Sequence, residues 1–276
     1  TIATTTTTTI APSAAGDGRL VIGVLLPLSN TLVGEPMLAA IETAIGRINA
    51  AGGALGRTVG LVVADEGTNT ATASSSIQDL IDQNVDAIIG PASSLIALST
   101  LSSIVSNGKL VCSPTASAIA LDEFPDDGLL FRTVPSDSLQ ARAIAEAVNQ
   151  TGAERVAIAY IDDPYGRPFS DAVEVALADE GLTAVERIAF SSTADDLSEQ
   201  AATIANSDAR VAVVLANSED ATRLIEALDD QDSADLATIV VNDALRNPAA
   251  PQRLQNIDPD LRARIVGVAP QADSGD

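Results

Sequence analysis

The chain has 276 residues, of which 46% are hydrophobic and 2% aromatic, and its formal net charge is −23. This length favours two lobes, and the apolar fraction supports cores built from Ala, Val, Ile and Leu. The negative charge repels phosphate backbones, which excludes nucleic acid as an expected partner. The sequence holds no histidine, so imidazole bases, imidazole metal ligands and histidine-activated nucleophiles are excluded as well.

The single cysteine also narrows the possible chemistry. Cys112 lies in an apolar run, where a small buried strand residue is the simplest interpretation. One cysteine forms neither an internal disulfide nor a cysteine metal cluster. The chain also lacks a G-x-G-x-x-G turn after a strand and a G-x-S-x-G turn, which argues against the enzymes that share a doubly wound fold. We therefore expect no enzyme, no metal and no cofactor.

The first 18 residues are a low-complexity run of Thr, Ala, Ser, Gly and Pro. Such a segment buries too little surface to offset the entropy of ordering, so residues 1–18 are predicted to be a disordered Thr-rich tether.

From residue 19 onward, apolar strand-like runs alternate with amphipathic helix-like runs. This rhythm predicts an α/β fold with parallel sheets flanked by helices, arranged as two Rossmann-like lobes with a ligand cleft between them. A break at the sequence Val134-Pro135-Ser136-Asp137 divides lobe 1 (19–134) from lobe 2 (135–268). Strands are predicted at 20–26, 58–64, 85–89, 109–113, 129–133, 154–161, 183–190, 210–215, 237–241 and 264–268. Helices are predicted at 35–51, 71–83, 95–106, 138–150, 166–180, 196–206 and 219–229.

Short motifs recur in a specific order along the whole folded part. An apolar strand at 19–27 leads into a Leu-Ser-Asn loop, and a helix ends in a Gly-rich turn at 49–57. Further matches lie at 85–94, 111–117, 131–140, 162–166 and 193–198. In these features the chain resembles the extracytoplasmic solute-binding proteins of ABC importers, in the leucine/isoleucine/valine-binding protein family, which have the type I periplasmic binding protein fold.

This resemblance carries expectations for the whole protein. It implies that an amino acid or related small carboxylate is bound by hinge closure, and that a membrane permease is the partner. It implies an extracytoplasmic lipoprotein whose N-terminal lipid anchors it to the outer face of the cell membrane. Residues 269–276 would begin a crossover back to lobe 1, with the remainder of the family's C-terminal region absent. The alternative role is a ligand-sensing domain of the same fold, of the amide/urea or receptor type.

Two serines follow the strand at 85–89 and open a predicted helix. Ser93 and Ser94 would place hydroxyls and backbone N–H groups where a carboxylate is favoured. An ordinary helix N-cap is the alternative, and the two are compatible. In the related proteins the serine that matches Ser94 contacts the carboxylate of a bound amino acid.

A second candidate segment follows the next strand. The resemblance implies that Ala116 and Ser117, with Thr115 beside them, hold the ligand's carboxylate and amino group through backbone and hydroxyl groups. Without the resemblance, the segment is an ordinary turn that contains proline.

The second lobe contributes two candidates. The resemblance implies that Tyr165, after the strand at 154–161, closes over the ligand, although a loop aromatic packed on its own helix is the alternative. Asp243 would pair with a ligand ammonium, against the alternative of a solvated charge. The acidic pairs Asp65-Glu66 and Asp162-Asp163 could bind a cation or act as acid and base, but solvated loop charges are favoured in so acidic a chain. The first loop lacks the aromatic that many amino-acid binders place over the ligand.

Overall fold

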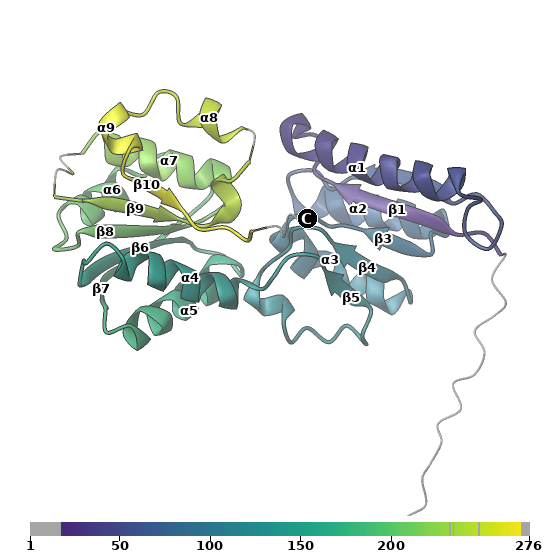
Figure 1. Cartoon of the computed structure of the whole chain (residues 1–276), viewed down its shortest axis with the longest axis horizontal. Coiled ribbons are helices and arrows are strands. Elements are labelled where there is room, and N and C mark those ends of the chain that lie inside the picture. Colours follow the sequence, from purple (N-terminus) through teal and green to yellow (C-terminus); the bar gives the residue numbers. More distant parts are fainter. Residues whose placement is uncertain (1–17, 232, 234, 248, 272–276) are drawn as a thin grey trace, which may run out of the picture.

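The computed structural model describes residues 18–231, 233, 235–247 and 249–271. Figure 1 shows two α/β bodies side by side, each built on its own sheet. We call the body built on the first sheet the first lobe and the other the second lobe. The predicted tether at 1–18 and the end of the predicted crossover lie almost wholly outside the described residues.

The first sheet has five strands in the order β2-β1-β3-β4-β5, and every pair is parallel. Continuous apolar runs form its centre, as in β1, where the last four residues are buried. The strands are β1 (Val21–Leu26), β2 (Gly60–Asp65), β3 (Ala87–Ile89), β4 (Leu110–Ser113) and β5 (Leu130–Arg132). The helices are α1 (Thr31–Ala50), α2 (Thr70–Asp82), α3 (Ser94–Ser106) and the 3-10 helix η1 (Ile119–Leu121).

The second sheet repeats this plan, with the order β10-β9-β8-β6-β7 and parallel pairing throughout. Counted within each sheet, both orders are 2-1-3-4-5. The strands are β6 (Arg155–Ile161), β7 (Thr183–Phe190), β8 (Val211–Leu215), β9 (Thr238–Val241) and β10 (Ile265–Gly267). The helices are α4 (Asp137–Asn149), α5 (Gly166–Asp179), α6 (Ser198–Ala205), α7 (Ser218–Asp229), η2 (Asp243–Leu245), α8 (Ala250–Arg253) and α9 (Pro259–Arg262).

All ten predicted strands and all seven predicted helices are present, and the α/β prediction is confirmed. One helix start differs, because α1 begins at Thr31 and includes Pro36. Its first turn closes on the carbonyl of Asn30, and Pro36, in the second turn, lacks the N–H that would otherwise bond the carbonyl of Leu32. The short helices α8 and α9 were not predicted, because four residues are too few to show a helical period.

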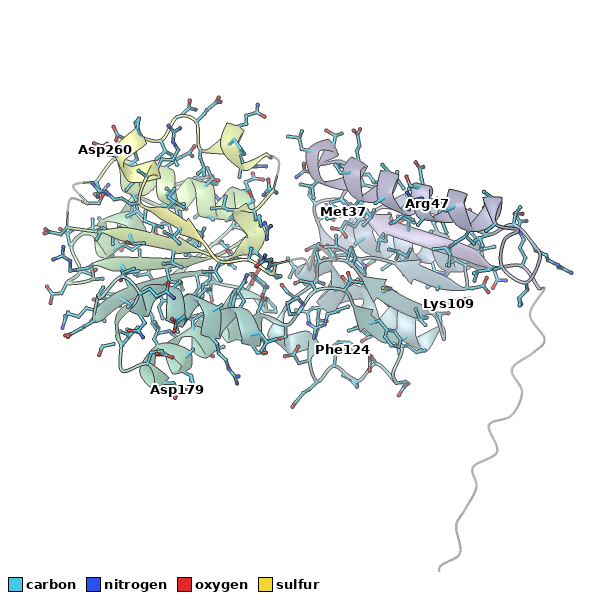
Figure 2. The ribbon with its side chains drawn as sticks, viewed as in Figure 1. Met37, Arg47, Lys109, Phe124, Asp179 and Asp260 are labelled. Carbon is cyan, nitrogen blue, oxygen red and sulfur yellow. The ribbon has the colours of Figure 1, made fainter. Side chains whose placement is uncertain are left out.

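The two sheets are covered differently. On the second sheet, α4 and α5 cover one face and α6 and α7 the other, each over a large buried apolar cluster. On the first sheet, α2 and α3 cover one face. Among the described residues, α1 is the only helix on the other face, where Val24, Leu26 and Ala92 are buried and Met37, labelled in Figure 2, packs against them.

An apolar groove of about 520 Å³ therefore remains open beside α1. Its lining includes Ile22, Ile41, Ile45, Ile48, Val59 and Ile89.

Candidate functional site

In a sheet of order 2-1-3-4-5, ligands settle at the carboxyl ends of the strands, beside the point where the strand order reverses. In the two sheets these points lie between β1 and β3 and between β6 and β8. The loops that follow β3, β4, β6 and β9 hold every residue predicted for the site. The lobes contact one another on this side, because α5, which follows β6, lies against η1, which follows β4.

The start of α3 is held by a carboxylate of the protein itself. Glu66 accepts from the backbone N–H groups of Ala92, at 2.8 Å, and Ser93, at 3.2 Å. Its side chain is 2% exposed, and burial raises the pKa of Glu66 to about 7, although the two N–H groups oppose the shift. The expectation of solvated charges is thus wrong for Glu66. The helix N-terminus does favour an anion, as predicted, but Glu66 already occupies its first donors.

Gly90 makes this arrangement possible. Its φ is +115°, and a Cβ there would lie 1.9 Å from the carbonyl oxygen of Leu25. A side chain would displace the loop from β1, so glycine is required where the chain turns from β3 towards α3.

The structure brings Ser94 and Ser117 together. The hydroxyl oxygen of Ser94 accepts from the backbone N–H groups of Ser117, at 3.1 Å, and Ala118, at 3.2 Å. Two accepted hydrogen bonds leave the hydroxyl hydrogen of Ser94 to be donated. This serine therefore ties the loop after β4 to the start of α3 and still retains a donor for an anion.

Three other predicted residues use their polar groups within the first lobe. The hydroxyl of Ser93 caps α3 by accepting from Ile96 N–H at 3.4 Å. The hydroxyl of Thr115 donates to the carbonyl of Ala92 at 2.8 Å. Ala116 is fully buried, and its N–H donates to the hydroxyl of Ser113 at 3.0 Å. These contacts fix the shape of the loop in which Ser117 lies.

Ser117 also contacts an aspartate that the sequence analysis did not select. Its hydroxyl donates to Oδ2 of Asp137 at 3.1 Å, and the N–H of Asp137 donates to the carbonyl of Ser117 at 2.9 Å. Asp137 is 1% exposed. Burial first, and then the charge of Asp243, raise the pKa of Asp137 to about 7. Its helix-opening position gave no sequence signal of such burial.

Tyr165 links the two lobes. Its ring packs against buried clusters of both sheets and meets the ring of Phe169 edge-on, with centroids 5.8 Å apart. Its hydroxyl oxygen accepts from Nδ2 of Asn242 at 2.8 Å. Burial and the charges of Asp137 and Asp243 raise the pKa of Tyr165 well above its ordinary value, so the phenol stays protonated.

Asp243 opens η2 directly after β9. Burial raises its pKa, and a hydrogen bond from the Gln140 side chain works against that shift. Nε2 of Gln140 also donates to the carbonyl of Val268 at 3.0 Å, which ties the first turn of α4 to the chain after β10. Gln140 therefore joins the helix that carries Asp137 to the loop that carries Asp243.

Two buried oxygens beside these groups have no hydrogen-bond partner within the described residues. They are Oε1 of Gln140 and Oδ1 of Asn242, whose side chains are 7% and 1% exposed. Together with the two aspartates and the tyrosine they form what we call the acceptor corner: Asp137, Gln140, Tyr165, Asn242 and Asp243. Buried acceptors of this kind cost free energy until a donor reaches them. The corner is thus suited to a group rich in N–H donors.

A pocket of about 220 Å³ lies beside this corner, with Asn242 and Asp243 in its wall. The rest of its lining is mostly apolar and includes Leu245, Leu254 and Ile265. Such a lining favours the binding of a small aliphatic group.

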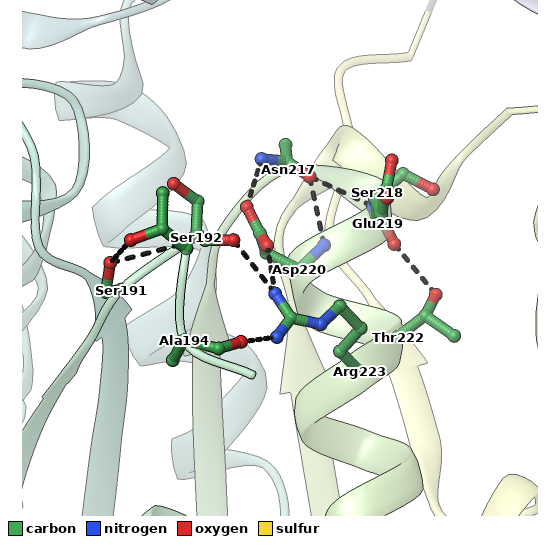
Figure 3. A network of polar contacts seen from close by, with 10 residues as sticks. Ser191, Ser192, Ala194, Asn217, Ser218, Glu219, Asp220, Thr222 and Arg223 are labelled. Carbon is green, nitrogen blue, oxygen red and sulfur yellow. Dashed lines mark hydrogen bonds and ion pairs between the residues drawn. The ribbon is translucent and has the colours of Figure 1, made fainter. Parts of the chain in front are cut away.

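A network of polar contacts holds the loop after β7 in the second lobe (Figure 3). Arg223 of α7 donates to the carbonyls of Ser192, at 3.0 Å, and Ala194, and pairs with the buried Asp220 at 3.1 Å. Asn217, after β8, caps α7 by accepting from the N–H groups of Glu219 and Asp220. The residue that follows the loop after β8 is therefore a helix cap whose side-chain amide is already bonded.

Neither a membrane span nor a metal cluster is found in the part of the chain that the structure describes. No helix there combines the length and the apolar character that crossing a membrane requires. No three His, Cys, Asp or Glu side chains are grouped there to hold a metal ion.

The family model for periplasmic binding proteins matches residues 19–258. The chain belongs to this family, so the resemblance seen in the motifs is confirmed. It is 30% identical over 178 residues to the Leu/Ile/Val-binding protein BraC3 of Rhizobium johnstonii, a match that covers 63% of this chain and 48% of that protein. The chain spans about half the length of the curated relatives it matches.

Solved structures share the fold. The leucine-binding protein LivK of Thermotoga maritima has a TM-score of 0.74 and 21% identity, over 86% of this chain and 67% of that one. A solute-binding protein of an ABC transporter from R. palustris, solved with benzoate, has a TM-score of 0.70 and 19% identity, over 86% of this chain and 65% of that one. The predicted type I architecture is confirmed.

Proposed function

We propose that this chain is the ligand-binding part of an extracytoplasmic solute-binding protein that delivers an amino acid to an ABC importer. The acceptor corner carries this proposal. An ammonium group offers three N–H donors and a positive charge, which the unpartnered oxygens of Gln140 and Asn242 and the carboxylate of Asp243 require. A benzoate-like ligand offers neither.

The opposite end of the ligand is a carboxylate at the start of α3. Ser94 retains a hydroxyl hydrogen to donate there, and Ser117 lies in the loop that Ser94 holds. Ser93, Thr115 and Ala116 shape this subsite through their contacts within the lobe. Tyr165 covers the ligand from the second lobe, and the apolar pocket beside Asp243 takes an aliphatic side chain.

The binding step is hinge closure between lobe 1 (19–134) and lobe 2 (135–268), with residues 269–276 beginning the return to lobe 1. Support comes from the two separate sheets and from the hydrogen bond between Gln140 and Val268, which ties the chain after β10 to the start of α4. A membrane permease that recognises the closed form is the partner, and an N-terminal lipid holds the protein at the outer face of the membrane. No bond is made or broken.

Titration calorimetry of the intact chain tests this function. We expect L-leucine or another aliphatic amino acid to bind. We expect benzoate not to bind, because it has no N–H donor for the acceptor corner. Saturable binding of benzoate without binding of any amino acid would replace this proposal with an aromatic carboxylate binder. Labelling of the full-length protein in cells with a radioactive fatty acid tests the lipid anchor separately.

A further inference from the structure

The acceptor corner holds more negative charge than its surroundings neutralise. Asp137 comes from the first turn of α4 and Asp243 from η2, and Gln140 bridges the two elements. The cation facing Asp137 is Arg132 of β5. Its Nη2 already pairs with Oδ1 of Asp122 at 2.5 Å, and its Nη1 donates to the carbonyl of Ala118. Arg132 is therefore shared with Asp122 and offsets the charge of Asp137 only in part. Arg246, which lines the same pocket as Asp243, donates Nη1 to the carbonyl of Pro270 at 2.6 Å.

The other neighbours of Asp137 do not supply positive charge either. Ser117, after β4, gives a single neutral hydrogen bond. Tyr165, ahead of α5, is a neutral phenol, and Asp122 after η1 is itself an anion. Two carboxylates that share a largely desolvated site and only part of one arginine's charge do not both stay ionised, because desolvation and mutual repulsion favour one bound proton.

We propose that the Asp137–Asp243 pair holds one proton in the ligand-free protein, and that the cationic group of the ligand replaces this proton on binding. Asp137 is then a specificity-determining residue that acts through the charge of the corner. In this step one carboxylic O–H bond breaks, the proton passes to water or buffer, and an N–H group of the ligand hydrogen-bonds to the carboxylate. The inference rests on the proposed function and deepens it, because it adds a selection for positive charge.

The exchange gives binding a defined pH dependence. A bound cation lowers the pKa of a neighbouring carboxyl, so the complex holds less proton than the free protein. The pKa of Asp137 is about 7 in the free protein. Affinity for an amino acid therefore falls as pH falls below about 7, by up to about tenfold per pH unit. It is constant at higher pH, as long as the ligand keeps its ammonium.

Calorimetry in two buffers of different ionisation enthalpy measures the proton directly. With L-leucine or another amino acid that binds, we expect release of about half a proton at pH 7, close to one near pH 5.5 and close to none near pH 9. Asp137→Asn should abolish the release. Asp208→Asn, a matched change in an exposed carboxylate on the second lobe, should leave it unchanged. Binding without proton release, or unchanged release in Asp137→Asn, would overturn the inference.

A second readout needs no ligand. The pKa of Asp137 is about 7 in the folded protein and about 4 in the unfolded chain, so protonation of Asp137 stabilises the fold. This stabilisation is complete below about pH 4 and is lost as the pH rises through about 7. The melting temperature of the wild type should therefore fall between pH 4 and 7 relative to Asp137→Asn.

If Asp137→Asn does not fold, Ser117→Ala is the substitute variant, because loss of its hydrogen bond to Asp137 should move proton release to higher pH. Failure of amino acids to bind while this slope persists would defeat the proposed function, whereas binding with no slope would defeat the inference.

Discussion

The two lobes share one strand order but not one set of covering helices. The second sheet is covered on both faces by helix pairs, whereas the face of the first sheet beneath α1 has one helix and an open apolar groove. By position in the chain, α1 corresponds to α5. The companion of α5 is α4, and α4 follows β5, the last strand of the first sheet. Helix α4 therefore lies in the segment that leaves the first sheet, yet it packs on the second sheet.

This comparison explains the groove. Among the described residues, no second helix lies beside α1 over Ile22, Ile45 and Ile89, so the groove stays open. The cores therefore differ because of connectivity, although the apolar residues of β1 and β6 are alike. The first lobe should tolerate changes beneath α1 that the second lobe cannot tolerate beneath α5.

The largest expected effect tests that difference directly. Phe169→Ala removes a fully buried ring beneath α5 and should lower the free energy of unfolding by about 3–5 kcal/mol. Ile45→Ala, in the open groove beside α1, should cost about 1 kcal/mol or less because the side chain already faces solvent in part. Urea unfolding of both variants measures the two values. Equal losses would show that the groove is closed in solution.

The next effect concerns the contribution of the first lobe to binding. Ser94→Ala removes the donor that we propose for the ligand's carboxylate and the acceptor for two backbone N–H groups. We expect amino-acid affinity to fall by about 1.5–3 kcal/mol, or roughly tenfold to a hundredfold. Ser99→Ala, further along α3, is the control and should bind normally. Normal affinity in Ser94→Ala would make this serine a structural tie only.

A supporting contact of the second lobe should cost slightly less. Arg223→Gln leaves the carbonyls of Ser192 and Ala194 without their donor and Asp220 without its cation. We expect a loss of about 1–3 kcal/mol in unfolding free energy. Arg155→Gln breaks an exposed ion pair instead and should cost less than about 1 kcal/mol. A thermal unfolding series decides between them, and similar small losses would show that the network in Figure 3 adds no stability.

The smallest effect comes from net charge, which also differs between the halves. Residues 135–276 hold 26 of the 38 acidic residues and 10 of the 15 basic ones. Raising NaCl from about 0.05 M to about 1 M screens this repulsion and should raise the melting temperature by a few degrees. Hydrogen exchange should show the larger gain in protection in the second lobe. Equal gains in both lobes would contradict a charge-based cause.

The fold was largely predictable because its signal is local and repeated. Apolar runs such as β8 and amphipathic runs such as α7 each identify one element, and their alternation indicates parallel sheets. Helices α8 and α9 were not predicted, because four residues are too few to show a helical period. The open sheet face beside α1 was not predicted, because whether a sheet face is covered depends on which distant segment of the chain packs on it.

The site was predictable only in part. Ser94 and Ser117 follow strand ends, where sequence position alone indicates a ligand. The burial of Glu66 and Asp137 was not predictable, because it arises from segments that meet only in the folded chain. Glu66 reaches N–H groups 26 and 27 residues away, and Asp137 meets Ser117 at a separation of 20. In a chain so rich in acids, nothing local distinguishes these two from solvated carboxylates.

The central claim is that the acceptor corner binds the ammonium of an amino acid, and one comparison of ligands tests it most directly. Calorimetry should compare L-leucine with 4-methylpentanoate, which is leucine without its ammonium, on the wild type, on Asp243→Asn and on the control Asp208→Asn. We predict that Asp243→Asn weakens leucine binding by about tenfold to a hundredfold and leaves binding of 4-methylpentanoate nearly unchanged. Equal weakening of both ligands, or of neither, would contradict the claim.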